Sequence, residues 1–101
     1  MPPALEIVPL DHPGHFQLRG ELDISTEESL RQLLQGLDPN PAVLDLSELV
    51  FMDSSGLRVL LQAAQKANGV PRVIVERPSR AVRRLLEVAL PTGVPGLEIR
   101  E

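Results

Sequence analysis

The sequence feature that most restricts the fold is a short apolar run, residues 42–46, which reads Ala-Val-Leu-Asp-Leu. A polar corner, Asp53-Ser54-Ser55-Gly56, separates this run from a helical pattern of apolar residues over residues 57–67. A short, nearly continuous apolar run is typical of a strand that is covered on both faces. The stretch therefore predicts a buried strand, a turn and a helix, which together form the repeating unit of an α/β domain.

The chain before this unit predicts a β-hairpin and a helix. Residues 4–20 alternate between apolar and polar side chains around a Pro-Gly turn at residues 11–14, as expected of a hairpin. Ser25 is the expected cap of the next helix, with Glu28 completing a capping box. Leucines at helical spacing form the apolar face of this helix: Leu30, Leu33, Leu34 and Leu37.

The chain after the corner predicts two more strands and another helix. Residues 72–76 read as a buried strand, and Ser79 is the expected cap of a helix that ends before Pro91. The apolar face of that helix is Val82, Leu85, Leu86 and Ala89. With a last strand over residues 97–100, the order β-β-α-β-α-β-α-β predicts one α/β domain with a mostly parallel sheet and an N-terminal antiparallel hairpin.

Composition limits the functions that the domain can have. A chain of 101 residues supports one core. A net charge of −4 and only two aromatic residues, Phe16 and Phe51, argue against direct binding of nucleic acid. The chain has no cysteine and hence no disulfide. No apolar stretch approaches 18 residues and no signal peptide is recognisable, so we expect a cytoplasmic protein without membrane insertion.

The corner Asp53-Ser54-Ser55-Gly56 is the main candidate site. A helix cap needs one side-chain oxygen, whereas this corner offers three. The N-terminus of a helix can also bind an anion or carry a phosphate on a hydroxyl. A phosphate on Ser54 or Ser55 would add about −1.5 to −2 charges and repel Asp53 and any partner packed there. The residues alone leave a simple cap, an anion site and a phosphorylation switch open.

A second acidic corner, Glu21-Leu22-Asp23, follows the predicted hairpin. These residues could equally form a solvent-exposed loop that leads into the next helix. In a parallel sheet, however, the carboxyl ends of neighbouring strands lie along one edge. We therefore expect Asp23 and Ser54 to share a surface.

The remaining polar residues do not indicate catalysis. A serine nucleophile needs a base, and the only histidines, His12 and His15, lie at the first turn. Two histidines without cysteines do not make a typical metal set, and no Gly-rich nucleotide loop is present. Arg80, Arg83 and Arg84 read as the solvated face of their helix. We expect no catalytic residue, no metal and no cofactor.

The motifs together resemble the STAS domain family, specifically the bacterial anti-sigma factor antagonists, and the likeness extends from about Leu5 to Leu90. It rests on Gly-Glu-Leu-Asp at residues 20–23, Leu-Asp-Leu-Ser at residues 44–47 and Phe-Met-Asp-Ser-Ser-Gly-Leu at residues 51–57. Ser-x-x-Val-x-Arg-Leu-Leu at residues 79–86 completes the set. The resemblance implies a single STAS domain over residues 1–101.

The resemblance also implies a partner switch without enzyme activity. The unphosphorylated antagonist binds an anti-sigma factor that is itself a serine kinase, and a sigma factor is released. The kinase then phosphorylates the first serine of the motif, which is Ser54, with Ser55 as the second choice, and a metal-dependent serine phosphatase reverses the step. Asp23, Asp53, Ser54, Ser55 and Gly56 would line the docking surface.

The family also offers an alternative role. Stand-alone STAS proteins serve as docking or scaffold subunits in stress-signalling assemblies or lipid-transport ATPase complexes, without a phospho-switch. The sequence departs from the family pattern at its end, because Glu101 follows the last predicted strand where relatives continue into another helix. Either that helix is dispensable, or an apolar patch remains exposed and another chain covers it, for which a weak homodimer is the expected arrangement.

Overall fold

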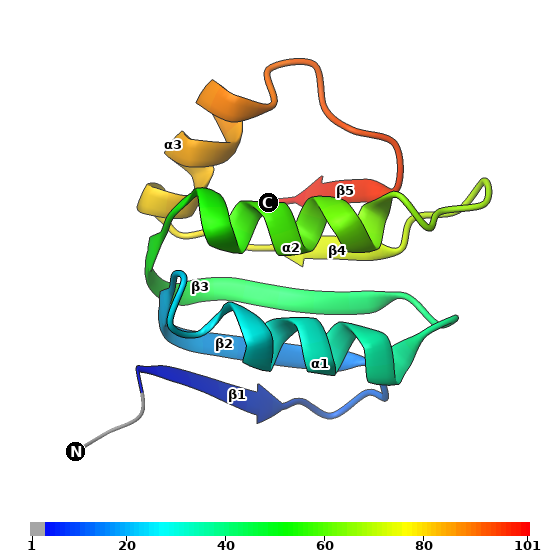
Figure 1. The fold of residues 1–101 in the computed structure, drawn as a ribbon, viewed down its shortest axis with the longest axis horizontal. Helices are drawn as coiled ribbons and strands as arrows, with labels where there is room; N and C mark the ends of the chain where they lie inside the picture. The colour runs from blue at the N-terminus through cyan, green and yellow to red at the C-terminus, as the bar shows by residue number, and fades with distance from the viewer. Residues whose placement is uncertain (1–3) are drawn as a thin grey trace.

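The computed structural model describes residues 4–101 (Figure 1). Eight elements follow one another in the predicted order. They are β1 (Leu5–Pro9), β2 (His15–Leu22), α1 (Glu27–Leu37), β3 (Ala42–Met52), α2 (Ser54–Ala64), β4 (Val73–Glu76), α3 (Arg80–Ala89) and β5 (Leu97–Arg100).

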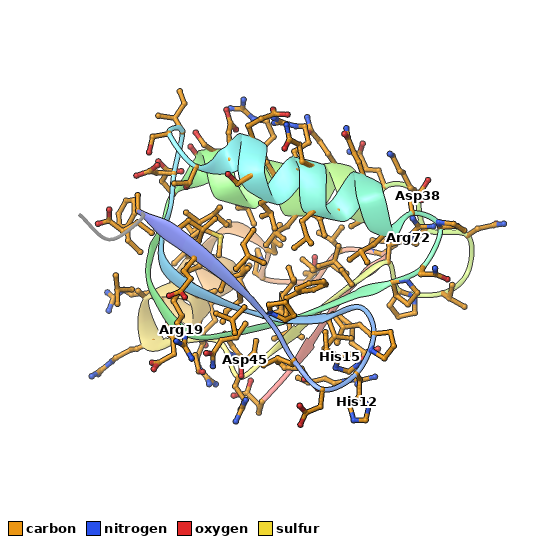
Figure 2. The ribbon with its side chains drawn as sticks, turned by 90° about the horizontal axis from the view of Figure 1, so that it is seen from below. His12, His15, Arg19, Asp38, Asp45 and Arg72 are labelled. Carbon is orange, nitrogen blue, oxygen red and sulfur yellow. The ribbon has the colours of Figure 1, made fainter. Side chains whose placement is uncertain are left out.

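The five strands form one sheet in which the spatial order equals the chain order, β1-β2-β3-β4-β5. Strands β1 and β2 pair antiparallel, and every later pair is parallel. Helices α1 and α2 lie side by side over one face of this sheet (Figures 1 and 2). The predicted α/β domain with a mostly parallel sheet and an N-terminal hairpin is confirmed.

The core lies between the sheet and the helices and is almost entirely aliphatic. Its fully buried side chains are mainly leucines, since Leu18, Leu22, Leu30, Leu44, Leu46, Leu49 and Leu60 are all 0% exposed. Truncating any one of them to alanine would cost about 2–5 kcal/mol of stability. None of the helices in residues 4–101 is long and apolar enough to cross a membrane.

Strand β3 is longer than predicted and reaches Met52 instead of ending at Leu46. The polar pair Ser47-Glu48 interrupts the apolar pattern without ending the strand. It coincides with a shift in register, because Gln17 pairs with Asp45 whereas Arg19 pairs with Glu48. Such bulges insert an extra residue and bend the strand. Strand β2 likewise continues to Leu22, so the two strands end together.

The predicted buried strand is confirmed for residues 42–46, which are all buried, but polar groups cover part of the second face. Helices α1 and α2 lie on one face, while Arg19, Asp45, His12 and His15 lie on the other side (Figure 2). Asp45 is only 1% exposed. It is covered by polar neighbours, and its carboxylate is bound by the Arg77 guanidinium. On this face, a buried carboxylate that accepts hydrogen bonds from neighbouring residues takes the place of a second apolar layer.

Helix α3 lies beyond the carboxyl end of β4, beside the second half of β3 (Figure 1). The predicted cap, Ser79, is confirmed, since its hydroxyl accepts from the Val82 N–H at 3.4 Å. The same hydroxyl donates to the Leu49 carbonyl at 2.6 Å, which fixes the start of α3 against β3. Val82 and Leu86 are buried, but Ala89 is exposed, so the predicted apolar face is one residue too long.

Candidate functional site

The site forms where β2 and β3 end beside each other. Leu22 and Met52 are paired in the last register position of the two strands. The next residue, Asp53, donates its backbone N–H to the Leu22 carbonyl at 3.2 Å. Asp23 and Asp53 therefore leave the sheet at neighbouring points of one edge, as the sequence predicts. We call this region, residues 21–25 and 50–56, the corner surface.

Asp53 is the cap of α2. Its backbone is extended, with φ −113° and ψ −170°, and its Oδ1 accepts from the N–H groups of Ser55 at 2.8 Å and Gly56 at 3.3 Å. Capping by an aspartate both satisfies free N–H groups and places a negative charge at the positive end of the helix. Because Asp53 performs this role alone, the two serine hydroxyls are not needed for the cap.

The two serines differ in their exposure. Ser54, the first residue of α2, is exposed, whereas Ser55 is half-buried. Within residues 4–101 neither hydroxyl takes part in a hydrogen bond. An enzyme that modifies a serine must bring its own reacting groups to the oxygen, so exposure favours Ser54.

Asp23 is held by a comparable turn. Its Oδ1 accepts from the Ser25 hydroxyl at 2.6 Å and from the Ser25 N–H at 2.9 Å. These bonds lower the pKa of Asp23 below its ordinary value, with a smaller contribution from Thr26. The carboxylate is therefore ionised near neutral pH and fixed in direction, close to where β3 ends and α2 begins with Ser54.

The predicted capping box of α1 is wrong. Ser25 turns back to Asp23, and Glu28 pairs with Arg31 at 2.6 Å instead of reaching the helix start. The N-cap is Thr26, whose side chain makes no capping bond to the helix. Its buried hydroxyl accepts from the Asp23 N–H at 2.9 Å and donates to the Glu21 carbonyl at 3.0 Å. Thr26 thus holds the loop below Asp23.

Gly56 lies beneath the corner surface and is buried. A Cβ atom at this position would stand 2.6 Å from Leu22 Cγ and 3.0 Å from Met52 Cγ. Glycine is therefore required because the first turn of α2 rests directly on the strand ends. This close approach determines where Ser54 sits relative to Asp23.

Three exposed apolar side chains in the corner surface were not identified from the sequence. Ile24 is 74% exposed, Val50 68% and Phe51 45%. Ile24 follows Asp23, and Phe51 pairs with Glu21 across the two strands. The available signal was the run Leu49-Val50-Phe51-Met52, which cannot place every side chain on one face of a strand. Exposed apolar residues around ordered carboxylates are typical of a protein-docking surface.

The corner surface does not suit a small free anion. The N–H groups of Ser55 and Gly56 are already bonded to the Asp53 carboxylate, and Asp23 adds a second negative charge nearby. An incoming anion would have to displace one carboxylate and approach the other. The geometry therefore favours a docked protein over a bound phosphate or nucleotide.

The other polar candidates lie elsewhere. The His12 and His15 rings contact each other edge to face, with centroids 5.3 Å apart, at the hairpin turn. His15 pairs with Val43 at the start of β3, whereas Ser54 follows its end, roughly 30 Å away along an eleven-residue strand. No group of three potential metal ligands occurs in residues 4–101. On α3, Arg80 and Arg84 are exposed and Arg83 pairs with Glu101.

A comparison with known families agrees with this architecture. A family model described as "Mlab, STAS domain" matches residues 9–92, which is most of the chain and includes both strands and the helix that form the corner surface. The chain belongs to the STAS domain family.

Proposed function

We propose that this protein is an anti-sigma factor antagonist whose binding is switched off by phosphorylation of Ser54. The observation that carries the proposal is an exposed serine at the first position of α2, next to a capping aspartate, on a corner surface that also carries the exposed apolar residues Ile24, Val50 and Phe51. Such a surface can bind a protein when neutral and repel it when charged.

The unphosphorylated protein binds through its apolar residues. Burial of Ile24, Val50 and Phe51 would remove apolar area from water, which favours association. The fixed carboxylates of Asp23 and Asp53 would orient the partner, an anti-sigma factor with serine kinase activity. Occupation of the anti-sigma factor frees its sigma factor.

Phosphorylation reverses the interaction. The Ser54 oxygen forms a bond to the γ-phosphorus of ATP, the bond from that phosphorus to ADP breaks, and the hydroxyl proton passes to a base of the kinase. The product carries about −1.5 to −2 charges next to Asp53. The positive end of α2 tolerates this charge, so the fold is retained. A partner packed on the corner surface would have to desolvate the phosphate, and the complex dissociates.

A metal-dependent serine phosphatase would restore the neutral state by hydrolysing the phosphoserine. In this scheme the protein supplies only the acceptor hydroxyl and the docking surface. It needs no cofactor and no catalytic residue of its own, and it acts in the cytoplasm, where sigma factors work.

The test uses the purified protein with ATP and a kinase-type anti-sigma factor from the same organism. Intact-mass analysis should show one added phosphate on the parent and on Ser55→Ala, and none on Ser54→Ala. Ser54→Asp should fold normally and bind the anti-sigma factor at least tenfold more weakly than Ser54→Ala. Phosphate on Ser55 alone, or equal binding by the Asp and Ala variants, would contradict the proposal.

A second candidate is a constitutive docking or scaffold subunit. The exposure of Ile24, Val50 and Phe51 favours it, because these side chains can support binding without any modification. In that case the parent, Ser54→Ala and Ser54→Asp would bind the partner with similar affinity. Permease and ATPase genes beside this gene, in place of an anti-sigma kinase gene, would point the same way.

A further inference from the structure

A cavity of about 240 Å³ lies between α1 and α2, at the opposite end of α2 from Ser54. Its walls include Leu34 of α1 and Ala63 of α2. Ala42 and Val59, which are 1% and 2% exposed, line it from the core side. Two of its lining residues, Ala42 at the start of β3 and Ala63 in α2, have small side chains.

The mouth of the cavity is polar and carries more positive than negative charge. Arg31, Lys66 and Arg72 line it together with a single carboxylate, Asp38. Glu27 and Glu28 pair with Arg31 beside this mouth, and Asp38 pairs with Arg72, so these two arginines are already neutralised. The charge available to attract an anion is that of Lys66, which also lines the mouth.

The three cations are not equivalent. Arg72 is bound by Asp38, and the two side chains point toward each other at the end of α1 (Figure 2). Arg31 is engaged by Glu27 and Glu28. Lys66 forms no ion pair with any residue in the described range 4–101. Its ammonium group is therefore the one that can receive a ligand's charge without breaking an existing pair.

We propose that this cavity binds a small organic anion with a short alkyl chain, a carboxylate of the hexanoate class. The alkyl chain would lie against Leu34, Ala42, Val59 and Ala63, and the carboxylate would meet Lys66 at the mouth. A water molecule occupies about 30 Å³, so the cavity has room for at least about eight non-hydrogen atoms. Hexanoate has that size, with one charged end and one apolar end.

The position of this site has a consequence for the corner surface. Helix α2 is one uninterrupted element from Ser54 to Ala64, and it carries cavity residues in its second half. A ligand between α1 and α2 would contact α2, and the first turn of this helix packs on Leu22 and Met52. Binding in the cavity is measured independently of any kinase or partner, so it can fail or succeed without affecting the proposed switch.

The experiment is an NMR titration of the uniformly ¹⁵N-labelled full chain with hexanoate, hexylamine, hexanol and acetate. Hexanoate should shift the amide signals of Leu34, Val59, Ala63 and Lys66 in a saturable manner. Hexanol and acetate should bind more weakly, since each lacks half of the recognised features, and hexylamine should bind weakest. Equal binding of hexanoate and hexylamine, or shifts confined to other regions, would overturn the proposal.

Substitutions of single residues test whether hexanoate binds in this cavity. Lys66→Gln should weaken hexanoate binding about fivefold, because one charge-assisted contact is lost. Arg58→Gln removes a cation from the exposed face of α2 outside the cavity and should leave the affinity unchanged. Ala63→Leu should fill the cavity and abolish binding, with thermal melting used to verify its fold. If Lys66→Gln and folded Ala63→Leu both bind like the parent, the cavity is not the site.

Discussion

The α-carbon of Gly56 lies against Leu22, so that a Cβ atom on Gly56 would be only 2.6 Å from Leu22 Cγ. Leu22 is fully buried at the end of β2, and Gly56 belongs to the first turn of α2. The contact therefore joins the two strand ends to the helix that carries Ser54. The geometry of the corner surface depends on the absence of a side chain at position 56.

Gly56→Ala should destabilise the protein by about 1–3 kcal/mol in urea unfolding, because the new methyl group must push Leu22 or α2 aside. Gly36→Ala in α1 is the matched control, since a Cβ there meets nothing within 4 Å. That change should stabilise the protein by up to about 1 kcal/mol through helix propensity. Equal effects of the two substitutions would show that the close packing at Gly56 does not constrain the corner.

Asp53→Ala should cost about 0.5–2 kcal/mol of unfolding free energy, since the N–H groups of Ser55 and Gly56 lose their acceptor. Asp53→Asn keeps an acceptor oxygen and should recover most of this loss. Hydrogen exchange at the first turn of α2 should increase in the alanine variant only. Stability of Asp53→Ala equal to that of the parent would contradict the capping role.

Asp45 should make stability depend on acidity. Burial raises its pKa, but hydrogen bonds from Ser47 and the contact with Arg77 outweigh burial and hold the pKa below the ordinary value of 3.8. A carboxylate with a lowered pKa in the folded state stabilises the protein fully above about pH 4. This contribution is lost as the pH falls from 3.8 through the folded pKa.

Asp45→Asn tests this dependence. At pH 7 the substitution should cost about 1–2 kcal/mol, a modest amount because Arg77 is 65% exposed and water screens its charge. Urea unfolding between pH 7 and pH 2.5 should then show a smaller acid-induced loss for the variant than for the parent. Parallel pH profiles for the two proteins would exclude Asp45 as the source.

The exposed apolar residues of the corner surface should contribute to partner binding but not to folding. Ile24→Ser and Phe51→Ala should each weaken binding of the anti-sigma factor by about 1–2 kcal/mol, or roughly five- to thirtyfold. Val88→Ser is the matched control, because Val88 is 77% exposed but lies on α3, away from the corner. Calorimetric titration against one partner preparation compares the three variants.

The three substitutions should leave the melting temperature nearly unchanged. A loss of affinity for Val88→Ser equal to that for Phe51→Ala would mean that the docking surface lies elsewhere or is much larger.

The order of the elements could be predicted because each helix and strand has a clear apolar period. The leucines of α1, for example, fall on one face at spacings of three and four residues, and Leu30 is fully buried. The edge shared by Asp23 and Asp53 also followed from the sequence, since carboxyl ends of parallel strands always meet.

Side-chain choices between competing local partners could not be predicted. Ser25 donates both its hydroxyl and its backbone N–H to the Asp23 carboxylate, and this turn leaves Thr26 as the N-cap of α1. The length of β3 depends on pairing with β2, which lets the strand continue through the polar Ser47-Glu48 pair. The exposure of Val50 and Phe51 depends on the same strand pairing, so the local sequence pattern does not predict it either.

The sheet order has a consequence for how the chain assembles. Each strand from β2 onward pairs with the strand just before it in the chain, so no strand has to be inserted between two strands that are already paired. The corner surface uses only residues up to the first turn of α2, and its contacts with β2 and β3 are complete once these have left the ribosome. Short-range closure of this kind favours rapid folding. All residues of the corner surface therefore leave the ribosome before β4 and α3, and the later docking of Ser79 on the Leu49 carbonyl completes the support of β3.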